Sequence, residues 1–470
     1  MQRFPQAGGC PQLPRCLCLL LAAVAGPTLA DTPANCSYAD IQGSWIFHSS
    51  DADGDNSIDC TDSTPMENVV VLSLQEPNIA VDQFGNIGKW TLIYNQGFEA
   101  TVNGRTYFAF SYYEQDGDEV TSFCDRTFPG WSHDTTVRNW ACIQGQKQGA
   151  SVPKVHRVTR LDAEQGAKKY VNNHKLIEAI NAKKGGTWTA RAYPQHEELT
   201  VAEWHRRSGG HRSRLPQRPR AAPMTKEHRE IIQSLPDSFD WNDVNGINYV
   251  SPVRDQAQCG SCYAFSSMAA LESQVRILTN NTQQPVFSPQ DIVSCSAYAQ
   301  GCDGGFPYLI AGKYAKDFGV VAESCDPYQG SDTPTCGTDM SCGRTYAAHY
   351  RYVGGYYGAC NEALMMQSLV HNGPLVVGFE VYDDLRPYKD GVYHHDFALA
   401  EQLGGGQIDP FELTNHAVLV TGYGTLNGTK FWNIKNSWSS DWGDNGYFKI
   451  QRGNDECAVE SLAVEVEVIL

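Results

Sequence analysis

The sequence has little that would hold the protein in a membrane. After residue 30, no run approaches the roughly 20 consecutive apolar residues that a helix needs to cross a bilayer. Basic residues are also scarce, since 36 Lys and Arg stand against 53 Asp and Glu, for a formal net charge of −17. In a chain that begins like a secreted protein, these absences predict no membrane-spanning segment after residue 30 and no nucleic-acid partner.

A complete metal-binding motif is also missing. The run from Asp51 to Asn56 (DADGDN) resembles the start of a calcium-binding loop. Its glycine does not occupy the sixth position, however, and no glutamate closes the loop. We interpret the run as a solvated acidic turn and expect no metal cofactor.

The first 30 residues have the composition of a secretory signal peptide. Arg3 and Arg15 supply positive charge, residues 17–25 form a short apolar core, and Thr28-Leu29-Ala30 is a small-x-small exit. Cleavage there would make Asp31 the mature N-terminus and deliver the chain to an oxidising lumen, where disulfides form. Three sequons give the expected glycosylation sites, which are Asn35, Asn280 and Asn427.

Residues 31–149 have the pattern of an all-β domain. Strands are predicted at 69–74, 90–94 and 105–113, with a hairpin turn at Asn103-Gly104. The segment carries 17 Asp and Glu against 5 Lys and Arg, a charge of −12. Its four cysteines allow three pairings, and they are Cys36, Cys60, Cys124 and Cys142.

Residues 150–234 differ in charge. They carry 17 Lys and Arg against 8 Asp and Glu, or +9, with six histidines and no cysteine. An apolar stripe predicts one helix over 163–184, and the basic, Pro- and Gly-rich run from His205 to Pro223 predicts an exposed linker that is open to proteolysis. A solvated connector and a nucleic-acid tail are alternatives, but we favour an inhibitory pro-segment.

The charge layout suggests how such a pro-segment would respond to pH. It lies between the acidic segment of −12 and residues 235–470, which carry 28 Asp and Glu against 12 Lys and Arg, or −16. Acidification neutralises carboxylates, and protonated histidines in the pro-segment do not replace the lost attraction. We therefore expect the pro-segment to loosen in an acidic compartment.

The functional interpretation depends most on the stretch from Gln256 to Phe265 (QAQCGSCYAF). Cys262 opens a run with helical apolar spacing, so its thiol lies at a helix N-terminus, where the helix dipole favours the thiolate. The C-x-x-C that it forms with Cys259 has two other interpretations, a redox dithiol and half of a zinc site.

Further motifs favour a thiolate nucleophile. Residues 259–263 match the C-G-[SA]-C-[WY] signature of papain-like peptidases, whose His and Asn follow downstream. Here TNHAVLV supplies His416 and KNSW supplies Asn436, 154 and 174 residues after Cys262. The chain thus resembles the papain-like cysteine peptidases, and its runs DTPANC (31–36), GGTWTA (185–190), GCDGGFPY (301–308) and PFELTNH (410–416) resemble the members that release dipeptides.

The resemblance implies an α+β fold with a papain-like, two-lobed catalytic domain at 235–470. It also implies an N-terminal all-β, barrel-like exclusion domain at 31–149, after the signal peptide at 1–30, and an excised propeptide at 150–234. A cut into heavy and light chains is expected near 396–409. The implied enzyme is a lysosomal homotetramer with a chloride ion, matured by an activating endopeptidase. It would release dipeptides from free N-termini of peptides and proteins, including proenzymes.

The resemblance also assigns catalytic roles. Cys262 would be the nucleophile, and His416 would hold its thiolate as an ion pair and then protonate the leaving amine. Asn436 would orient the imidazole. Gln256 would donate its amide to the oxyanion, and Trp438 would shield the contact between His416 and Asn436 from water.

Binding roles follow in the same way. The carboxylate of Asp31 would bind the ammonium of the substrate N-terminus, and the exclusion domain would close the cleft beyond the second residue. Phe306 and Tyr308 would line the pocket for the second substrate residue. The Tyr308 backbone and the Tyr352 hydroxyl would contact chloride.

The family pattern further implies five disulfides and leaves Cys360 and Cys457 free or mutually paired. Ser439 occupies a position where the family usually has glycine, so a positive φ there would cost serine about 1 kcal/mol. A papain-like endopeptidase and a secreted thiol-disulfide oxidoreductase, with a labile Cys259–Cys262 bridge, remain the alternative functions. The implied disulfides are Cys36–Cys124, Cys60–Cys142, Cys259–Cys302, Cys295–Cys336 and Cys325–Cys342.

Overall fold

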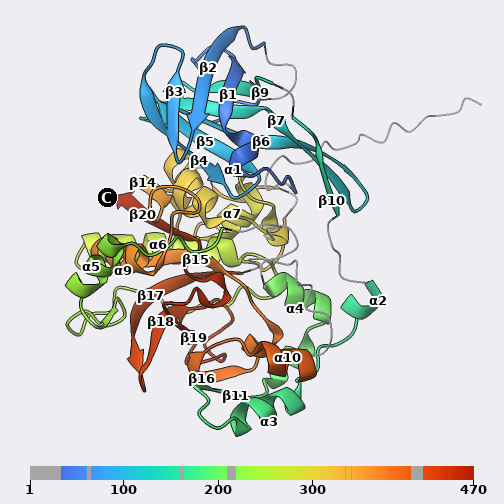
Figure 1. Ribbon diagram of the computed structural model, residues 1–470, viewed down its shortest axis with the longest axis vertical. Helices are drawn as coiled ribbons and strands as arrows, with labels where there is room; N and C mark the ends of the chain where they lie inside the picture. Colours follow the sequence, from blue (N-terminus) through green and yellow to red (C-terminus); the bar gives the residue numbers. More distant parts are fainter. Residues whose placement is uncertain are drawn as a thin grey trace, which may run out of the picture.

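A computed structural model describes residues 33–60, 65–149, 151–157, 163–208, 219–333, 335–339, 341–403 and 416–470. Asp31 and much of the expected heavy–light cut lie outside these ranges. A β domain caps one end of a larger α+β body, and the segment between them in sequence runs along the side and the far end of that body (Figure 1).

The N-terminal domain is a closed antiparallel barrel. Eight strands of the described chain form it in the order β1-β2-β3-β4-β5-β6-β8-β9, and β9 pairs back onto β1. The strands predicted at 69–74 and 105–113 fall in β2 and β6, and the strand predicted at 90–94 overlaps β4, which ends one residue earlier. The predicted hairpin turn has φ of 50° at Asn103 and 73° at Gly104. The bounds are β1 Gly43–Ser49, β2 Asn68–Gln75, β3 Ile79–Asp82, β4 Ile87–Ile93, β5 Gly97–Val102, β6 Arg105–Asp116, β8 Gly130–Asp134 and β9 Ala141–Lys147.

A ribbon extends from the barrel. Strand β7 (Glu119–Thr127) pairs with β6, and β10 (Lys154–Arg157) pairs with β7. The short helix α1 (Tyr38–Ile41) precedes the barrel. Two disulfides fasten this domain, Cys36–Cys124 and Cys60–Cys142, as the resemblance implies.

The segment of charge +9 at residues 150–234, called the basic segment below, is folded against the catalytic body. The prediction of one helix over 163–184 is wrong, because two asparagines interrupt it. The amide of Asn172 donates to the carbonyl of Tyr193 at 3.0 Å, and the side chain of Asn173 accepts the N–H of Leu176 at 3.1 Å and so begins a new helix. The elements are α2 Ala163–Gly166, α3 His174–Ala182, β11 Trp188–Ala190, η1 Pro194–Glu198, α4 Val201–Arg207 and α5 Lys226–Ser234.

The expectation of an exposed linker from His205 onward is also wrong at its start. Arg207 is only 8% exposed, because α4 carries it into the catalytic cleft. A capping box at Thr200 and Glu203 begins this helix, and Trp204 is fully buried beneath it. Residues 209–218 lie outside the described residues.

The catalytic body has a helical lobe and a sheet lobe. The helical lobe is built around α6 (Cys262–Leu278), which confirms the helix predicted after Cys262. In the sheet lobe the strand order is β11-β16-β19-β18-β17-β15-β20-β14-β13, so β11 of the basic segment adds to its edge. The bounds are β12 Phe239–Asp240, α7 Pro289–Cys295, η2 Gly301–Asp303, η3 Tyr308–Tyr314, α8 Ala315–Asp317, β13 Val320–Val321, β14 Arg344–Tyr352, α9 Glu362–Asn372, β15 Leu375–Phe379, η4 Asp383–Leu385, β16 Tyr388–Tyr393, α10 Phe397–Leu403, β17 His416–Leu426, β18 Thr429–Lys435, β19 Tyr447–Gln451, η5 Glu456–Ala458 and β20 Ala463–Ile469.

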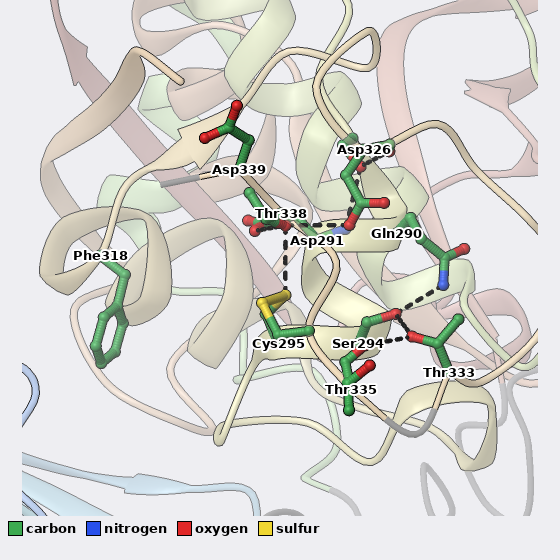
Figure 2. The surroundings of a disulfide bond; sticks show 12 residues. Gln290, Asp291, Ser294, Cys295, Phe318, Asp326, Thr333, Thr335, Thr338 and Asp339 are labelled. Atoms are coloured by element: carbon green, nitrogen blue, oxygen red, sulfur yellow. Dashed lines mark hydrogen bonds between the residues drawn. A yellow bond between two sulfur atoms is a disulfide. The ribbon is translucent and has the colours of Figure 1, made fainter. Parts of the chain in front are cut away.

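A disulfide-rich loop closes the outer side of the helical lobe. The Thr338 hydroxyl lies 2.7 Å from Asp291 Oδ1 and 3.0 Å from Asp326 Oδ2, beside the sulfur of Cys295 (Figure 2). Burial raises the pKa of Asp326. Disulfides Cys295–Cys336 and Cys325–Cys342 hold the loop.

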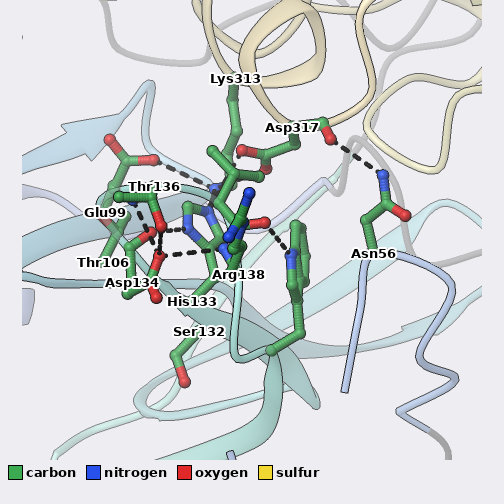
Figure 3. A network of polar contacts seen from close by, with 12 residues as sticks. Asn56, Glu99, Thr106, Ser132, His133, Asp134, Thr136, Arg138, Lys313 and Asp317 are labelled. Carbon is green, nitrogen blue, oxygen red and sulfur yellow. Dashed lines mark hydrogen bonds and ion pairs between the residues drawn. The ribbon is translucent and has the colours of Figure 1, made fainter. Parts of the chain in front are cut away.

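A buried charge network joins the barrel to the catalytic body. Lys313 Nζ lies 3.6 Å from Glu99 of the barrel and 3.0 Å from Asp317, which in turn lies 3.2 Å from Nε2 of His133 (Figure 3). Burial alone would raise the pKa of Asp317, but Lys313 and His133 lower it below its usual range. The network fixes the barrel on the helical lobe because each charge has a partner from the other domain or from its own helix.

Candidate active site

Cys262 begins helix α6, and its thiol is free and 1% exposed. Its neighbour Cys259 is bonded to Cys302, so a redox pair between Cys259 and Cys262 is excluded. The backbone N–H of Ala417 donates to the Cys262 sulfur at 3.4 Å. This contact brings the helical lobe and strand β17 of the sheet lobe together at the thiol.

His416 is the first residue of β17, next to Ala417, and Asn436 follows directly after β18. Nε2 of His416 lies 2.8 Å from Oδ1 of Asn436. Within the described chain, Nδ1 of His416 is buried and has no hydrogen-bond partner, which leaves this nitrogen to serve the thiol. Trp438 stacks on the imidazole with 4.9 Å between ring centroids. The histidine of one predicted motif therefore contacts the asparagine and the tryptophan of the other.

Burial shifts the pKa of the thiol and that of the imidazole in the directions that favour their neutral forms. Burial raises the pKa of Cys262 to about 12, against the lowering effect of the Ala417 N–H. Burial, together with repulsion from the Arg207 guanidinium, lowers the pKa of His416 to about 4. Burial therefore disfavours the expected thiolate–imidazolium pair while the basic segment covers the site, and it opposes the effect of the helix dipole on the thiol.

Gln256 lies where the sequence predicts an oxyanion donor, and its amide is already engaged. Nε2 donates to the carbonyl of Arg207 at 3.0 Å and to that of Cys259 at 2.9 Å, while Oε1 accepts from the Ser437 hydroxyl at 2.6 Å. The indole N–H of Trp438 also donates to the Arg207 carbonyl, at 3.4 Å. The basic segment thus places a peptide carbonyl against the predicted oxyanion donor.

Sequence reasoning did not identify Arg207 or its partners. Its guanidinium lies 2.6 Å from Oδ1 of Asp255, and the ring of Trp204 contacts Trp438 edge to face at 5.3 Å between centroids. The only sequence feature that includes Arg207 is the basic run from His205 to Pro223, and its composition predicts an exposed linker. The spacing of residues within one segment does not predict which of them will contact a cleft formed by distant parts of the chain.

The barrel lies over the other side of the predicted substrate groove. Phe306 is 2% exposed and stacks on Tyr94 of the barrel, with 3.8 Å between ring centroids. The hydroxyl of Tyr308 donates to Glu99 at 3.1 Å, so this side chain lies in the domain interface. Asp31 lies outside the described residues, but nearby Asn35 accepts the Asn95 amide at 3.1 Å, next to Tyr94.

The two residues predicted to contact chloride lie against each other. The rings of Tyr308 and Tyr352 are stacked, with 4.3 Å between centroids. The Tyr352 hydroxyl is buried and has no hydrogen-bond partner among the residues that the structure describes. A buried hydroxyl in this state is a donor available to an anion.

Other predicted positions are placed as follows. Cys360 and Cys457 are both free and buried. Ser439 has φ of 72°, so this position has the left-handed backbone that favours glycine. Of the sequon asparagines, Asn280 and Asn427 are exposed, and Asn35 is half-buried.

Comparison with known proteins agrees with this architecture. The sequence model of the papain family of cysteine proteases matches residues 235–466. The sequence model of the cathepsin C exclusion domain matches residues 31–147. Cathepsin C of Schistosoma mansoni is 42% identical over 464 residues, covering 97% of this chain and 99% of its own. A gut-specific cysteine proteinase of Caenorhabditis elegans is 35% identical over 265 residues, covering 51% of this chain and 75% of its own.

Solved pro-forms are similar in fold to part of this chain. Digestive procathepsin L 3 of Tenebrio molitor has 29% identity and a TM-score of 0.50, covering 63% of this chain and 88% of its own. ProCathepsin B S9 of Trypanosoma congolense has the same identity and TM-score, covering 63% and 98%. Among the described residues, no helix has the length and apolarity to cross a membrane.

The chain belongs to the papain family of cysteine proteases. Within that family it is a homologue of cathepsin C, a papain-like dipeptidyl exopeptidase with an exclusion domain. The predicted fold class is confirmed.

Proposed function

We propose that this protein is the zymogen of a lysosomal enzyme that releases dipeptides from free N-termini of peptides and proteins, including proenzymes. In the described form, the basic segment blocks the cleft through Arg207 and Trp204. Its removal would rehydrate the thiol and the imidazole and take away the positive charge that lowers the pKa of His416. Both changes favour the thiolate–imidazolium pair.

The chemistry then follows from the contacts in the site. The Cys262 thiolate would attack the scissile carbonyl, and the oxyanion would accept hydrogen bonds from Gln256 Nε2 and the backbone N–H of Cys262. Nδ1–H of the His416 imidazolium would protonate the leaving amine. Asn436 holds Nε2, which leaves Nδ1 to face the sulfur. Trp438 keeps water from that contact, and a water molecule later hydrolyses the thioester.

One observation carries the restriction to dipeptides. Tyr94 of the barrel stacks on Phe306, so the barrel covers the residue predicted to line the pocket for the second substrate residue. The contact between Asn35 and Asn95 holds the chain just after the N-terminus at the same place, four residues from Asp31. The carboxylate of Asp31 would bind the substrate ammonium there. A blocked amine would leave this carboxylate unpaired and would be rejected.

A chloride ion fits this arrangement. Tyr352 offers a buried hydroxyl with no hydrogen-bond partner among the described residues, and Tyr308, whose ring stacks on it, begins η3. These groups would hold the ion, which would supply negative charge beside the pocket formed by Phe306. Removal of halide by dialysis against a non-halide salt should lower kcat/KM, and its return should restore it.

The remaining proposals concern maturation and assembly. An activating endopeptidase would excise the basic segment and cut the chain near 396–409. Four copies of the chain would assemble into a homotetramer. The helix before that cut, α10, is held by the segment, because the amide of Asn173 donates to the carbonyl of Leu403 at 2.6 Å. Excision would therefore free the region of the second cut.

The decisive experiment compares a free-amine dipeptidyl substrate with its N-acetylated twin on processed enzyme. We expect turnover of the free amine alone, and Asp31→Ala should abolish dipeptide release while Cys262 still reacts with an alkylating reagent. Equal turnover of the two substrates would overturn the dipeptidyl assignment and favour an endopeptidase.

A further inference from the structure

The ion pair between Arg207 and Asp255 joins a segment that is removed to a residue that stays. Nη2 of Arg207 lies 2.6 Å from Oδ1 of Asp255, and the arginine side chain is 9% exposed while that of the aspartate is 45% exposed. Loss of the basic segment takes the cation away. The mature enzyme is then left with a carboxylate in its cleft, directly before Gln256 in sequence.

This carboxylate is fixed in place before any substrate arrives. Oδ1 of Asp255 accepts the backbone N–H of Ala257 at 2.9 Å, which holds the side chain in a turn. Arg254 does not neutralise it, because that guanidinium lies 2.6 Å from Glu323 and donates to the carbonyl of Phe287 at 2.9 Å. Once Arg207 is gone, Asp255 has no other ion-pair partner among the described residues, and a rigid carboxylate of this kind is suited to bind a basic side chain.

The position of Asp255 relates it to the leaving part of the substrate. Asp255 forms an isolated antiparallel bridge with Trp438, and Trp438 stacks on His416, which protonates the leaving amine. Tyr94 of the barrel covers Phe306, the residue assigned to the pocket for the dipeptide that is removed. Asp255 therefore lies on the side from which the shortened peptide departs.

We propose that Asp255 is a specificity-determining residue, which binds an arginine or lysine at the first or second position after the scissile bond. The basic segment shows that Asp255 can bind an arginine of a chain that lies in the cleft, because the guanidinium of Arg207 reaches Asp255 while its carbonyl lies on Gln256. The inference rests on the proposed dipeptidyl function and names a substrate class for it: chains with a basic residue just beyond the dipeptide that is removed.

The test uses processed wild-type enzyme and free-amine hexapeptides in two series. One series varies the first residue after the dipeptide, and the other varies the second. Each series contains arginine, citrulline as its neutral isostere, and glutamate. The product is identified by mass and kcat/KM is measured at low ionic strength, where a partly exposed ion pair is least screened.

We expect arginine to exceed citrulline by about five- to tenfold in kcat/KM in at least one series, with glutamate lowest, since a partly exposed charge pair is worth modest energy. In Asp255→Asn the ratio of arginine to citrulline should fall to near one. Asp243→Asn is the matched control, because Asp243 is an exposed aspartate that also accepts a backbone N–H, from Gly246 at 2.8 Å. This variant should keep the wild-type ratio.

Two results would overturn the inference: equal rates for arginine and citrulline in both series, or a preference that survives in Asp255→Asn. Failure of the dipeptidyl function gives a different result, namely products cut at internal bonds. The residue after each observed cut would still report whether Asp255 selects a basic side chain.

Discussion

The ring of His196 meets that of Trp204 edge to face, with 4.4 Å between their centroids. His196 also stacks on Tyr193 at 4.7 Å, and its Nδ1 is buried without a hydrogen-bond partner among the described residues. Burial, and then repulsion from Arg207, lowers the pKa of this histidine to about 3. The docked segment therefore contains a histidine that must stay neutral.

The lowered pKa of His196 predicts that the basic segment is released from the cleft at acidic pH. A group whose pKa is lower in the folded state than its free value of 6.5 stabilises the docked form above that pH, and the stabilisation is lost as pH falls from 6.5 toward 3. At about pH 5 the loss from His196 is about 2 kcal/mol. Cutting by an added peptidase should therefore be faster at acidic than at neutral pH.

The control is His196→Phe, which keeps an aromatic ring and removes the titration. Its cutting rate should depend less on pH than that of the wild type, with the remainder due to the carboxylates that face the basic segment. Equal pH dependence in the two proteins would exclude His196 as a sensor. No difference between about pH 5 and pH 7 in the wild type would also contradict the charge-based expectation.

A second prediction concerns the contact that blocks the cleft. Arg207→Gln removes the ion pair with Asp255 and keeps most of the side-chain length. We expect the zymogen thiol to be alkylated about tenfold faster, because Asp255 is partly exposed and screening reduces the value of the pair. Arg206→Gln is the control, since Arg206 is exposed. Identical alkylation of the two variants would show that Arg207 does not hold the segment in place.

A third prediction tests the attachment of the barrel. Lys313→Met removes the cation between Glu99 and Asp317 and leaves two buried carboxylates without it. Removal of one partner from a buried charge network typically costs about 3–5 kcal/mol. We expect a lower unfolding temperature and new cleavage of N-acetylated peptides, as the barrel detaches from the groove.

Lys316→Met is the matched control for this variant. Lys316 follows Lys313 by three residues and is half-buried. Its Nζ lies 5.9 Å from the ring centroid of Tyr350. Its loss should change stability little. Cleavage of N-acetylated peptides by Lys316→Met at the rate of Lys313→Met would mean that the charge network does not hold the barrel.

Local patterns in the sequence predicted much of the fold and the centre of the site. Helix α6, the strands around His416 and the hairpin turn at Asn103-Gly104 each follow from spacing within a few residues. The resemblance supplied the disulfide pairs, which residue patterns left open. Such features are predictable because each is determined within one short segment or shared by the whole family.

The parts that were missed depend on contacts between distant segments. Glu99 and Lys313 belong to different domains, and each looks like an ordinary surface charge in sequence. Arg207 belongs to a run with a solvated composition, yet it is buried because the cleft offers Asp255 and Gln256 as partners. The helix expected over 163–184 failed for a local reason, the competing side-chain bonds of Asn172 and Asn173.

The last prediction concerns Ser439, whose φ of 72° lies in the region that disfavours side chains. Ser439→Gly should relieve about 1 kcal/mol of backbone strain, while the loss of the bond from the Asp441 N–H to the serine hydroxyl, 3.2 Å long, offsets part of it. We expect a small rise in the unfolding temperature. Ser440→Gly is the control at a position without positive φ, where glycine adds only freedom to the unfolded chain and should lower stability. A fall in both variants would show that the hydroxyl bond outweighs the backbone strain at Ser439.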